Sequence, residues 1–249
     1  MTVLVTGAAS GIGAALLALL PPGSVALDRT AVPEGIVCDL SDPDDLVRAA
    51  HSIDGPLTGI AHVAGLPGTS DAATILAVNT LAPVALTEAL LPRLVAGASI
   101  VAVSSVTALR CDWADDALDA LIDAPRAAAL ARVADLPGAR AYEISKAALN
   151  RWAMQLAVQL HPRGIRVTTV SPGPVETPIL KDFEASIGLE RLAAAAAMTG
   201  RHGLPGEIAA VIAFLLSDAS GWVNGTDIRV DGGYHAIRHG APSIASMVR

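Results

Sequence analysis

The chain has 249 residues, 52% of them hydrophobic and 16% charged, with 24 acidic side chains against 17 basic ones and a formal net charge of −7. This apolar share excludes intrinsic disorder, and two cysteines are too few for a disulfide scaffold. The acidic balance, without any basic run, argues against nucleic acid as a partner. We therefore expect one globular domain spanning residues 1–249, reduced and cytoplasmic.

The chain carries no charge before Asp28. Such an uncharged stretch resembles a membrane span or a signal peptide. Three glycines interrupt it, a Pro-Pro pair breaks it, and no positively charged segment precedes it. We expect a strand at Thr2–Thr6, a turn and a buried helix at Gly11–Leu20 instead, and no contact with a membrane.

Strand-like and helix-like segments alternate along the rest of the chain. Strands are expected at Ser24–Asp28, Gly35–Asp39, Leu57–Val63, Ser99–Ser104, Ile165–Ser171 and near Asp227–Val230, and helices at Pro43–Ala50, Asp71–Leu91, Tyr142–Leu160, Phe183–Met198 and Pro205–Ser217. The link between Asp28 and Gly35 is too short for a crossover helix. This alternation predicts an α/β fold, a doubly wound parallel sheet with helices on both faces.

An unusual segment, residues 112–138, precedes the helix expected at Tyr142–Leu160. It is rich in Ala, Leu, Asp and Arg, and its apolar residues have the spacing of one or two short amphipathic helices around Pro125. We expect a helical insertion there. Cys111 and Trp113 either line a pocket or anchor this insertion.

A glycine-rich turn lies between the first strand and the first helix, with the sequence Thr6-Gly-Ala-Ala-Ser-Gly-Ile-Gly13. Glycines at such a turn let the backbone approach a pyrophosphate, which binds at the positive end of the helix. This predicts a dinucleotide site formed by Gly7, Ser10, Gly11, Ile12 and Gly13. An ordinary strand–helix turn is the alternative.

Asp28 ends the second expected strand, where a dinucleotide-binding fold places the acid that binds the ribose 2′-hydroxyl. A carboxylate accepts hydrogen bonds from a diol and repels a 2′-phosphate, so NAD(H) is favoured over NADP(H). Arg29 opposes this preference, because a guanidinium binds phosphate. A solvated carboxylate at a strand end is the alternative.

Tyr142-Glu-Ile-Ser-Lys146 opens the long helix, in a chain that has only two tyrosines and two lysines. Positions i and i+4 share one face of a helix, which places an ammonium beside a phenol. A neighbouring positive charge lowers the pKa of a phenol, so the pair predicts a general acid/base usable near neutral pH. A surface pair is the alternative, and the rarity of both residue types argues against it.

With both motifs in this order, the sequence resembles the short-chain dehydrogenase/reductase family over nearly its whole length. The resemblance implies a Rossmann-type fold and a catalytic tetrad of Asn79, Ser105, Tyr142 and Lys146. Besides the glycine turn, Asp28, Tyr142 and Lys146, the cofactor-binding residues that it implies are Asp39, Leu40, Ala64, Gly65, Pro172, Gly173, Val175 and Thr177. They occur in Cys38-Asp-Leu40, His62-Val-Ala-Gly65 and Ser171-Pro-Gly-Pro-Val-Glu-Thr177, and Val230-Asp-Gly-Gly233 matches the family's closing motif.

The family's pattern is not followed throughout. His62-Val stands where members have two asparagines, and 36 residues separate Ser105 from Tyr142, far more than in most members. This long gap and the short link after Asp28 resemble the bacterial 3α-hydroxysteroid dehydrogenase/carbonyl reductase branch.

The resemblance also implies a mechanism. NADH delivers a hydride to a ketone carbon, while Tyr142 protonates the oxygen and Ser105 donates a hydrogen bond to it. Lys146 lowers the pKa of Tyr142 and binds the ribose hydroxyls, and Asn79 holds a water that relays protons. Oxidation of a secondary alcohol follows the same path in reverse.

The end of the strand that carries Ser105, the insertion and residues 174–203 are expected to contact the substrate. Their side chains are mostly apolar: Val106, Leu109, Val175, Ile179, Leu180 and Phe183. This predicts a bulky hydrophobic ketone or secondary alcohol, such as a steroid or an aryl ketone, while Lys181 leaves a substrate carboxylate open. His235 and His239 lack a third ligand, so no metal site is expected.

Two other functions and the assembly stay open. An NADPH-dependent β-ketoacyl-carrier reductase is disfavoured by Asp28 and by the lack of a basic docking patch. A non-catalytic dinucleotide-sensing regulator would not need the Tyr–Lys pair, and an enoyl reductase would space that pair differently. Apolar residues around the long helix, namely Trp152, Met154, Leu156 and Val158, predict a subunit interface, and a homodimer is favoured over a tetramer.

Overall fold

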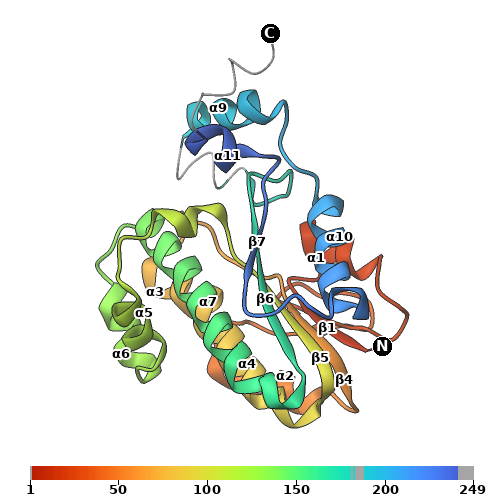
Figure 1. Cartoon of the computed structure of the whole chain (residues 1–249). Coiled ribbons are helices and arrows are strands. Elements are labelled where there is room, and N and C mark those ends of the chain that lie inside the picture. Colours follow the sequence, from red (N-terminus) through yellow and green to blue (C-terminus); the bar gives the residue numbers. More distant parts are fainter. Residues whose placement is uncertain (1, 181, 183–187, 241–249) are drawn as a thin grey trace.

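The computed structural model of the chain describes residues 2–180, 182 and 188–240 (Figure 1). Its centre is one sheet with the strand order β3-β2-β1-β4-β5-β6-β7, in which every neighbouring pair is parallel. The strands are β1 (Val3–Thr6), β2 (Val25–Asp28), β3 (Ile36–Val37), β4 (Leu57–His62), β5 (Leu94–Val103), β6 (Arg166–Pro172) and β7 (Asp227–Val230). The order reverses between β1 and β4, and such a reversal leaves a crevice at the carboxyl ends of the strands.

Helices cover both faces of this sheet, which confirms the predicted doubly wound architecture. Helices α1 (Gly11–Leu17) and α10 (Pro205–Leu216) pack on one face, and α2 (Pro43–Ser52), α4 (Ala82–Leu90) and α7 (Gly138–Leu160) on the other. Alternate residues of a strand supply the two cores: Leu4 packs with the second group, and Val3 and Val5 with the first.

The short link after β2 can connect two parallel strands because β3 is only two residues long. Leu27 pairs with Ile36 and Asp28 with Val37, in parallel, with no helix between the strands. A parallel pair normally needs a crossover of a dozen or more residues. Here the chain turns back through Val32 and Gly35, whose backbone groups are hydrogen-bonded, and forms an edge strand too short to need more.

The long helix expected at Asp71–Leu91 is divided into three parts. Helix α3 (Ala72–Leu76) leads into a π-helical turn at Ala77–Leu81, and α4 follows with Pro83 in its first turn. Proline lacks the N–H of a helix interior, so the regular hydrogen-bond pattern breaks just before it. Ala72–Arg93 has the length and apolarity of a membrane span, but 67% of its most apolar window is buried inside the protein, as in a core helix.

The insertion forms two helices, as predicted, α5 (Asp115–Ile122) and α6 (Arg126–Val133), on either side of Pro125. Leu118 and Leu121 are buried against α7. Cys111 and Trp113 pack on the same apolar cluster, so they anchor the insertion. Neither they nor the other residues of 112–138 line the two cavities at the carboxyl end of the sheet, so the predicted substrate contact of the insertion is wrong for those cavities.

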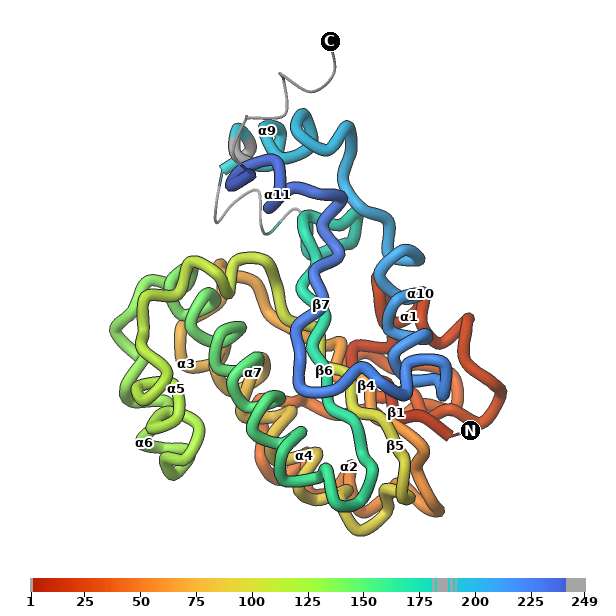
Figure 2. Tube along the Cα trace, viewed as in Figure 1, coloured from red at the N-terminus to blue at the C-terminus, as the bar shows by residue number. Residues whose placement is uncertain are grey.

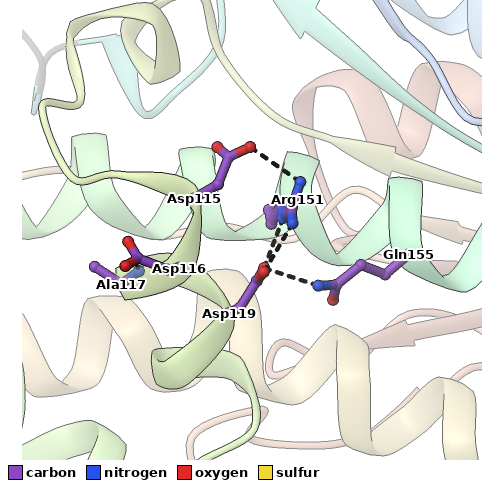
Figure 3. A network of polar contacts seen from close by, with 6 residues as sticks. All are labelled: Asp115, Asp116, Ala117, Asp119, Arg151 and Gln155. Atoms are coloured by element: carbon purple, nitrogen blue, oxygen red, sulfur yellow. Dashed lines mark hydrogen bonds and ion pairs between the residues drawn. The ribbon is translucent and has the colours of Figure 1, made fainter.

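A polar network fastens α5 to α7 (Figure 3). The Arg151 guanidinium donates to both carboxylate oxygens of Asp119, at 2.6 and 2.7 Å, and to Asp115 at 3.0 Å. Gln155 donates to Asp119 at 2.7 Å. A bidentate Arg–carboxylate pair fixes orientation as well as distance, so the insertion is held to the helix that carries Tyr142.

Several predicted boundaries are wrong by a turn. Helix α7 begins at Gly138, directly after Pro137. Tyr142 therefore lies in the second turn. A Cβ on Gly138 would lie 2.3 Å from the Gly68 oxygen, so the first turn packs closely on the loop after β4. Of the four apolar α7 residues predicted to lie at a subunit interface, Trp152 and Leu156 belong to the core, and Met154 and Val158 are exposed.

The part of the chain after β6 contains one helix that the hydrophobic pattern does not reveal. Helix α11 (Tyr234–His239) contacts α9 (Leu189–Thr199), and the two lie together beyond the carboxyl end of β7 (Figures 1 and 2). Of the helix expected at Phe183–Met198, residues 183–187 lie outside the described residues.

Candidate active site

Tyr142, Lys146 and Ser105 meet in one cavity of about 480 Å³ at the carboxyl end of the sheet. Helix α7 presents Tyr142 and Lys146 one turn apart, and the Lys146 ammonium lies 5.8 Å from the centre of the Tyr142 ring. Ser105 follows the end of β5, and its side chain is hydrogen-bonded to that of Tyr142. Three residues separated by up to 41 positions thus form one polar cluster.

The orientation of Ser105 is fixed by its own chain segment. Its hydroxyl oxygen accepts from the Thr107 backbone N–H at 3.2 Å and from the Thr107 hydroxyl at 3.0 Å, and it caps the 3₁₀ turn Val106–Arg110. With both lone pairs accepting, the Ser105 proton is left for the Tyr142 oxygen.

Burial decides the pKa values of the pair. It raises the pKa of Tyr142 to about 12, against the opposing hydrogen bond from Ser105, and it lowers the pKa of Lys146 to about 7. The prediction that Lys146 lowers the pKa of Tyr142 is therefore wrong for this structure. Removing both side chains from water disfavours both charged forms, and this outweighs their proximity.

A hydrogen bond to the end of β5 fixes the position of the Lys146 ammonium in the cavity. The ammonium donates to the Val103 carbonyl at 2.8 Å. The Ser104 hydroxyl donates to the Lys146 carbonyl at 3.1 Å, which ties the end of β5 to α7 from the other side. Two of the three ammonium protons are left to face the cavity.

Asn79, predicted to be catalytic, is buried in the π-helical turn and does not line this cavity. Its amide oxygen accepts from the Leu66 N–H at 2.7 Å, and its amide nitrogen donates to the Leu66 carbonyl at 3.0 Å and to Ser145 at 3.1 Å. Gly65 lies between Asn79 and Lys146. Asn79 thus positions the loop after β4 against α7.

A second cavity, of about 560 Å³, adjoins the first. The two share the lining residues Ile12, Val63, Gly65, Leu66, Thr177 and Ile179. We call the second the dinucleotide-side cavity and the first the substrate-side cavity. The predicted cofactor residues in the former are Gly7, Ser10, Gly11, Ile12, Gly13, Asp28, Asp39, Leu40, Ala64, Gly65 and Thr177, and those in the latter include Pro172, Gly173 and Val175.

The glycine turn forms one wall of the dinucleotide-side cavity, and at Gly7 and Gly13 this wall consists of backbone without side chains. A Cβ on Gly13 would lie 2.1 Å from the Gly7 oxygen, and a Cβ on Gly7 would lie 2.8 Å from the Ala64 backbone. Gly7 also has φ +70°, in the left-handed region. No side chain fits at either position, which brings the amino end of α1 within reach of a ligand backbone.

Asp28 and Asp39 are held by backbone groups at the edge of this cavity. The Asp28 carboxylate accepts from the Ala9 N–H at 3.0 Å and from the Thr30 N–H at 2.9 Å. Asp39 accepts from the N–H and hydroxyl of Ser41, which lowers the pKa of its carboxyl. Arg29 lines the same cavity.

The substrate-side cavity is only partly as predicted. Val106, Val175, Ile179 and Leu180 line it, whereas Leu109 does not and is exposed. Phe183 and Lys181 lie outside the described residues. Thr107 and Arg110, after Ser105, and Leu192 and Met198, within residues 174–203, line it from the expected segments. Lining residues outside those segments, which sequence reasoning missed, are Tyr234 and Arg238. The i, i+4 spacing of Tyr234 and Arg238 was the available signal.

His62, at the family's asparagine position, is a core residue. Its Nε2 lies 2.7 Å from the Thr87 hydroxyl oxygen, and its ring packs edge-on to Trp152 at 6.1 Å. Burial lowers its pKa to about 3, so the ring stays neutral. His235 and His239 stack at 4.5 Å, and the described residues contain no cluster of three potential metal ligands.

Comparison with known proteins fits this geometry. The chain is 34% identical to coniferyl-alcohol dehydrogenase of Pseudomonas sp. strain HR199 over 244 residues, 93% of this chain and 95% of that protein. It is 30% identical to 3-alpha-hydroxysteroid dehydrogenase/carbonyl reductase of Comamonas testosteroni over 248 residues, 94% of this chain and 96% of that one. The chain belongs to the short-chain dehydrogenase/reductase family.

Structural similarity within the short-chain dehydrogenase/reductases agrees. The crystal structure of the 3-alpha-hydroxysteroid dehydrogenase from Pseudomonas sp. B-0831 complexed with NADH superimposes with a TM-score of 0.85 at 30% identity, covering 96% of this chain and 98% of that one. The family model described as "Enoyl-(Acyl carrier protein) reductase" matches residues 126–235. The chain is an alcohol/carbonyl oxidoreductase of this family.

Proposed function

We propose that this protein is an NAD(H)-dependent enzyme that interconverts a bulky, mostly apolar secondary alcohol and its ketone, with Tyr142 as general acid/base. The observation that carries the proposal is the hydrogen-bonded Ser105–Tyr142 pair, with Lys146 beside it, in a cavity continuous with the dinucleotide-side cavity. A sensor that only bound a dinucleotide would not need this cluster.

The residues of the dinucleotide-side cavity fit NAD(H). Its volume is in the range of small-molecule sites, and its inner wall is bare backbone at Gly7 and Gly13. Asp28, held by two backbone N–H groups, favours a free 2′-hydroxyl and disfavours a 2′-phosphate. The NADH bound to the related Pseudomonas hydroxysteroid dehydrogenase supports the same cofactor here.

Bound NADH would supply the hydride that reduces the ketone carbon. Tyr142, whose pKa burial raises to about 12, keeps its proton at neutral pH and is the acid for the developing alkoxide. Ser105 donates a hydrogen bond to the same oxygen from a position that Thr107 fixes in advance. Lys146 keeps two ammonium protons for the ribose hydroxyls after its bond to Val103.

An apolar substrate is supported by the walls of the substrate-side cavity. Val106, Ile179, Leu180, Leu192 and Met198 line it together. Burying an aromatic or steroid ring against such side chains contributes about 25 cal/mol per Å² of apolar surface. Small polar ketones would leave most of this surface in contact with water.

Initial rates of NADH and NADPH oxidation with steroid, aryl and aliphatic ketones test the proposal. We expect kcat/KM to be at least about tenfold higher with NADH, and higher for bulky ketones than for small ones. Asp28→Asn should reduce the preference for NADH, whereas Arg29→Gln at the next position should increase it, because a guanidinium favours the 2′-phosphate of NADPH. Turnover of sugars or acyl thioesters alone would contradict the proposed substrate class.

A cytoplasmic homodimer is a further part of the proposal. Its support is the exposure of Met154 and Val158 on α7, at 46% and 73%, and the free state of Cys38 and Cys111. Light scattering on the purified protein tests it, since a monomer or a tetramer would give a different mass.

A further inference from the structure

The substrate-side cavity carries charges of one sign. Among the described residues that line it, the charged ones are Arg110, Lys146 and Arg238, with no aspartate or glutamate. The whole chain has the opposite bias, with 24 acidic and 17 basic side chains. Lys146 is buried beside Tyr142, whereas the two arginines are exposed. A cationic rim thus lies beyond the reacting groups.

Arg110 has no carboxylate partner among the described residues. It ends the 3₁₀ turn that Ser105 caps, which places its backbone about 10 Å from Ser105 along that turn. The neighbouring carboxylates, Asp112 and Glu143, both pair with Arg140 instead. Arg140 also donates to the Arg110 carbonyl at 3.4 Å, so the backbone is held while the guanidinium stays free to bind a ligand.

Arg238 reaches the cavity from α11, on the other side. Its guanidinium lies 5.7 Å from the Tyr234 ring centre and donates to the Tyr234 hydroxyl at 2.7 Å. That bond uses one of the five N–H donors of an arginine. Among the described residues Arg238 forms no ion pair either. Tyr234 therefore orients a guanidinium whose charge is not neutralised.

We propose that the substrate carries an anionic group, a carboxylate or a chemically similar oxyanion, at the end remote from its carbonyl, and that Arg110 and Arg238 bind it. Guanidinium groups bind such oxyanions through paired N–H donors. The apolar wall formed by Val106, Leu180 and Met198 lies in the same cavity and takes the body of the substrate. This inference rests on the proposed function and narrows its substrate class.

Three matched ketones provide the test: 4-(4-acetylphenyl)butanoate, its methyl ester, and the analogue with a terminal amine in place of the carboxylate. With NADH, we expect the wild-type kcat/KM to fall in the order anion, ester, cation, with about a tenfold gap between anion and ester. Added salt should shrink this gap, because it screens exposed charges.

Arg110→Gln and Arg238→Gln should each lower the ratio of kcat/KM for the anion over the ester by about fivefold, and Arg110→Lys should keep part of it. Arg93→Gln is the matched control. It also removes one positive charge, but next to the amino end of β5, whereas the cavity lies at the carboxyl ends of the strands. The control should keep the wild-type ratio.

The outcomes separate this inference from the proposed function. If the three ketones are reduced with equal kcat/KM, or the cationic ketone is preferred, the anionic-substrate proposal is overturned and the proposed function stands. No NADH oxidation with any of the ketones, or with the wider steroid and aryl panel, overturns the proposed function itself. A preference for the anion that Arg110→Gln and Arg238→Gln both leave unchanged also overturns the assignment.

Discussion

The substrate-side and dinucleotide-side cavities differ in how their lining residues are distributed along the chain. The dinucleotide-side cavity is built mainly from short loops that follow β1, β2, β3 and β4, each continuous in sequence. The substrate-side cavity combines residues from β5 and the turn after it, α7, the segment after β6, α9 and α11. The first is therefore visible in motifs, and the second only after the chain has folded.

The chemistry of the walls differs in the same way. Backbone N–H groups and glycines dominate the dinucleotide side, where a missing Cβ is the functional feature. Side chains dominate the substrate side, where aliphatic groups and two arginines define the shape and charge. Variants on the two sides should therefore give separable effects.

The largest expected effect comes from Tyr142→Phe. Loss of the acid should lower kcat by about 10³-fold, because general acid/base catalysis contributes about 10²–10⁴. The NADH Kd, measured by fluorescence titration, should change by less than about threefold, since the phenyl ring keeps the packing. With an uncharged ketone, which does not engage Arg238, Tyr234→Phe is the matched control, because the other tyrosine bonds Arg238 and not Ser105. Near-normal turnover by Tyr142→Phe would refute its role.

Gly13→Ala tests the backbone wall of the dinucleotide side. A Cβ would lie 2.1 Å from the Gly7 oxygen, so the turn has to move. We expect a loss of about 1–3 kcal/mol in unfolding free energy and more than a tenfold increase in the NADH Kd. Gly206→Ala is the control, because a Cβ at that position in α10 meets nothing within 4 Å. Chemical denaturation and titration of both variants would decide the question.

Arg126→Gln tests whether the insertion supports the dinucleotide side. The Arg126 guanidinium, from α6, donates to the Ser41 carbonyl at 2.5 Å, and Ser41 in turn holds Asp39. Removing this support should raise the NADH Kd by about three- to fivefold and leave kcat nearly unchanged. Arg132→Gln, on the same helix but over Trp113, is the control. Equal effects of the two variants would argue against a specific support.

The smallest expected effect, a change in how the unfolding free energy depends on pH, comes from His62→Asn. Because burial lowers the pKa of His62 to about 3, the folded ring stays neutral while the unfolded one, with a pKa near ~6.5, takes up a proton. Between these values the unfolded state binds more protons, so unfolding free energy falls with falling pH by up to about 1.4 kcal/mol per pH unit. Denaturation from pH 7 to 5 should show a shallower slope for the variant.

His161→Gln serves as the control, because His161 is exposed after the end of α7. An unchanged slope in His62→Asn would show that other groups cause the acid sensitivity.

Local features of the sequence predicted most of the scaffold. The alternation of strand and helix patterns placed the seven strands to within a few residues, apart from the five-residue amino-terminal extension of β5. Pro43 marked the start of α2, with Ser41 or Asp42 as the candidate cap, and the structure shows that it is Asp42, which accepts from the Asp44 N–H. Helix α11 was not predicted, because a helix of six residues is too short to show a hydrophobic periodicity.

The amino-acid sequence by itself determined the doubly wound fold, the glycine turn and the Tyr142–Lys146 spacing, because strand alternation, Cβ sterics and helix periodicity act over a few neighbouring residues. Only the tertiary structure decided the direction of the pKa shifts, since spacing gives proximity but not desolvation. It alone packed Trp113 on the apolar cluster that anchors the insertion and brought Arg110 and Arg238 to one cavity. Burial and long-range proximity depend on how the whole chain packs.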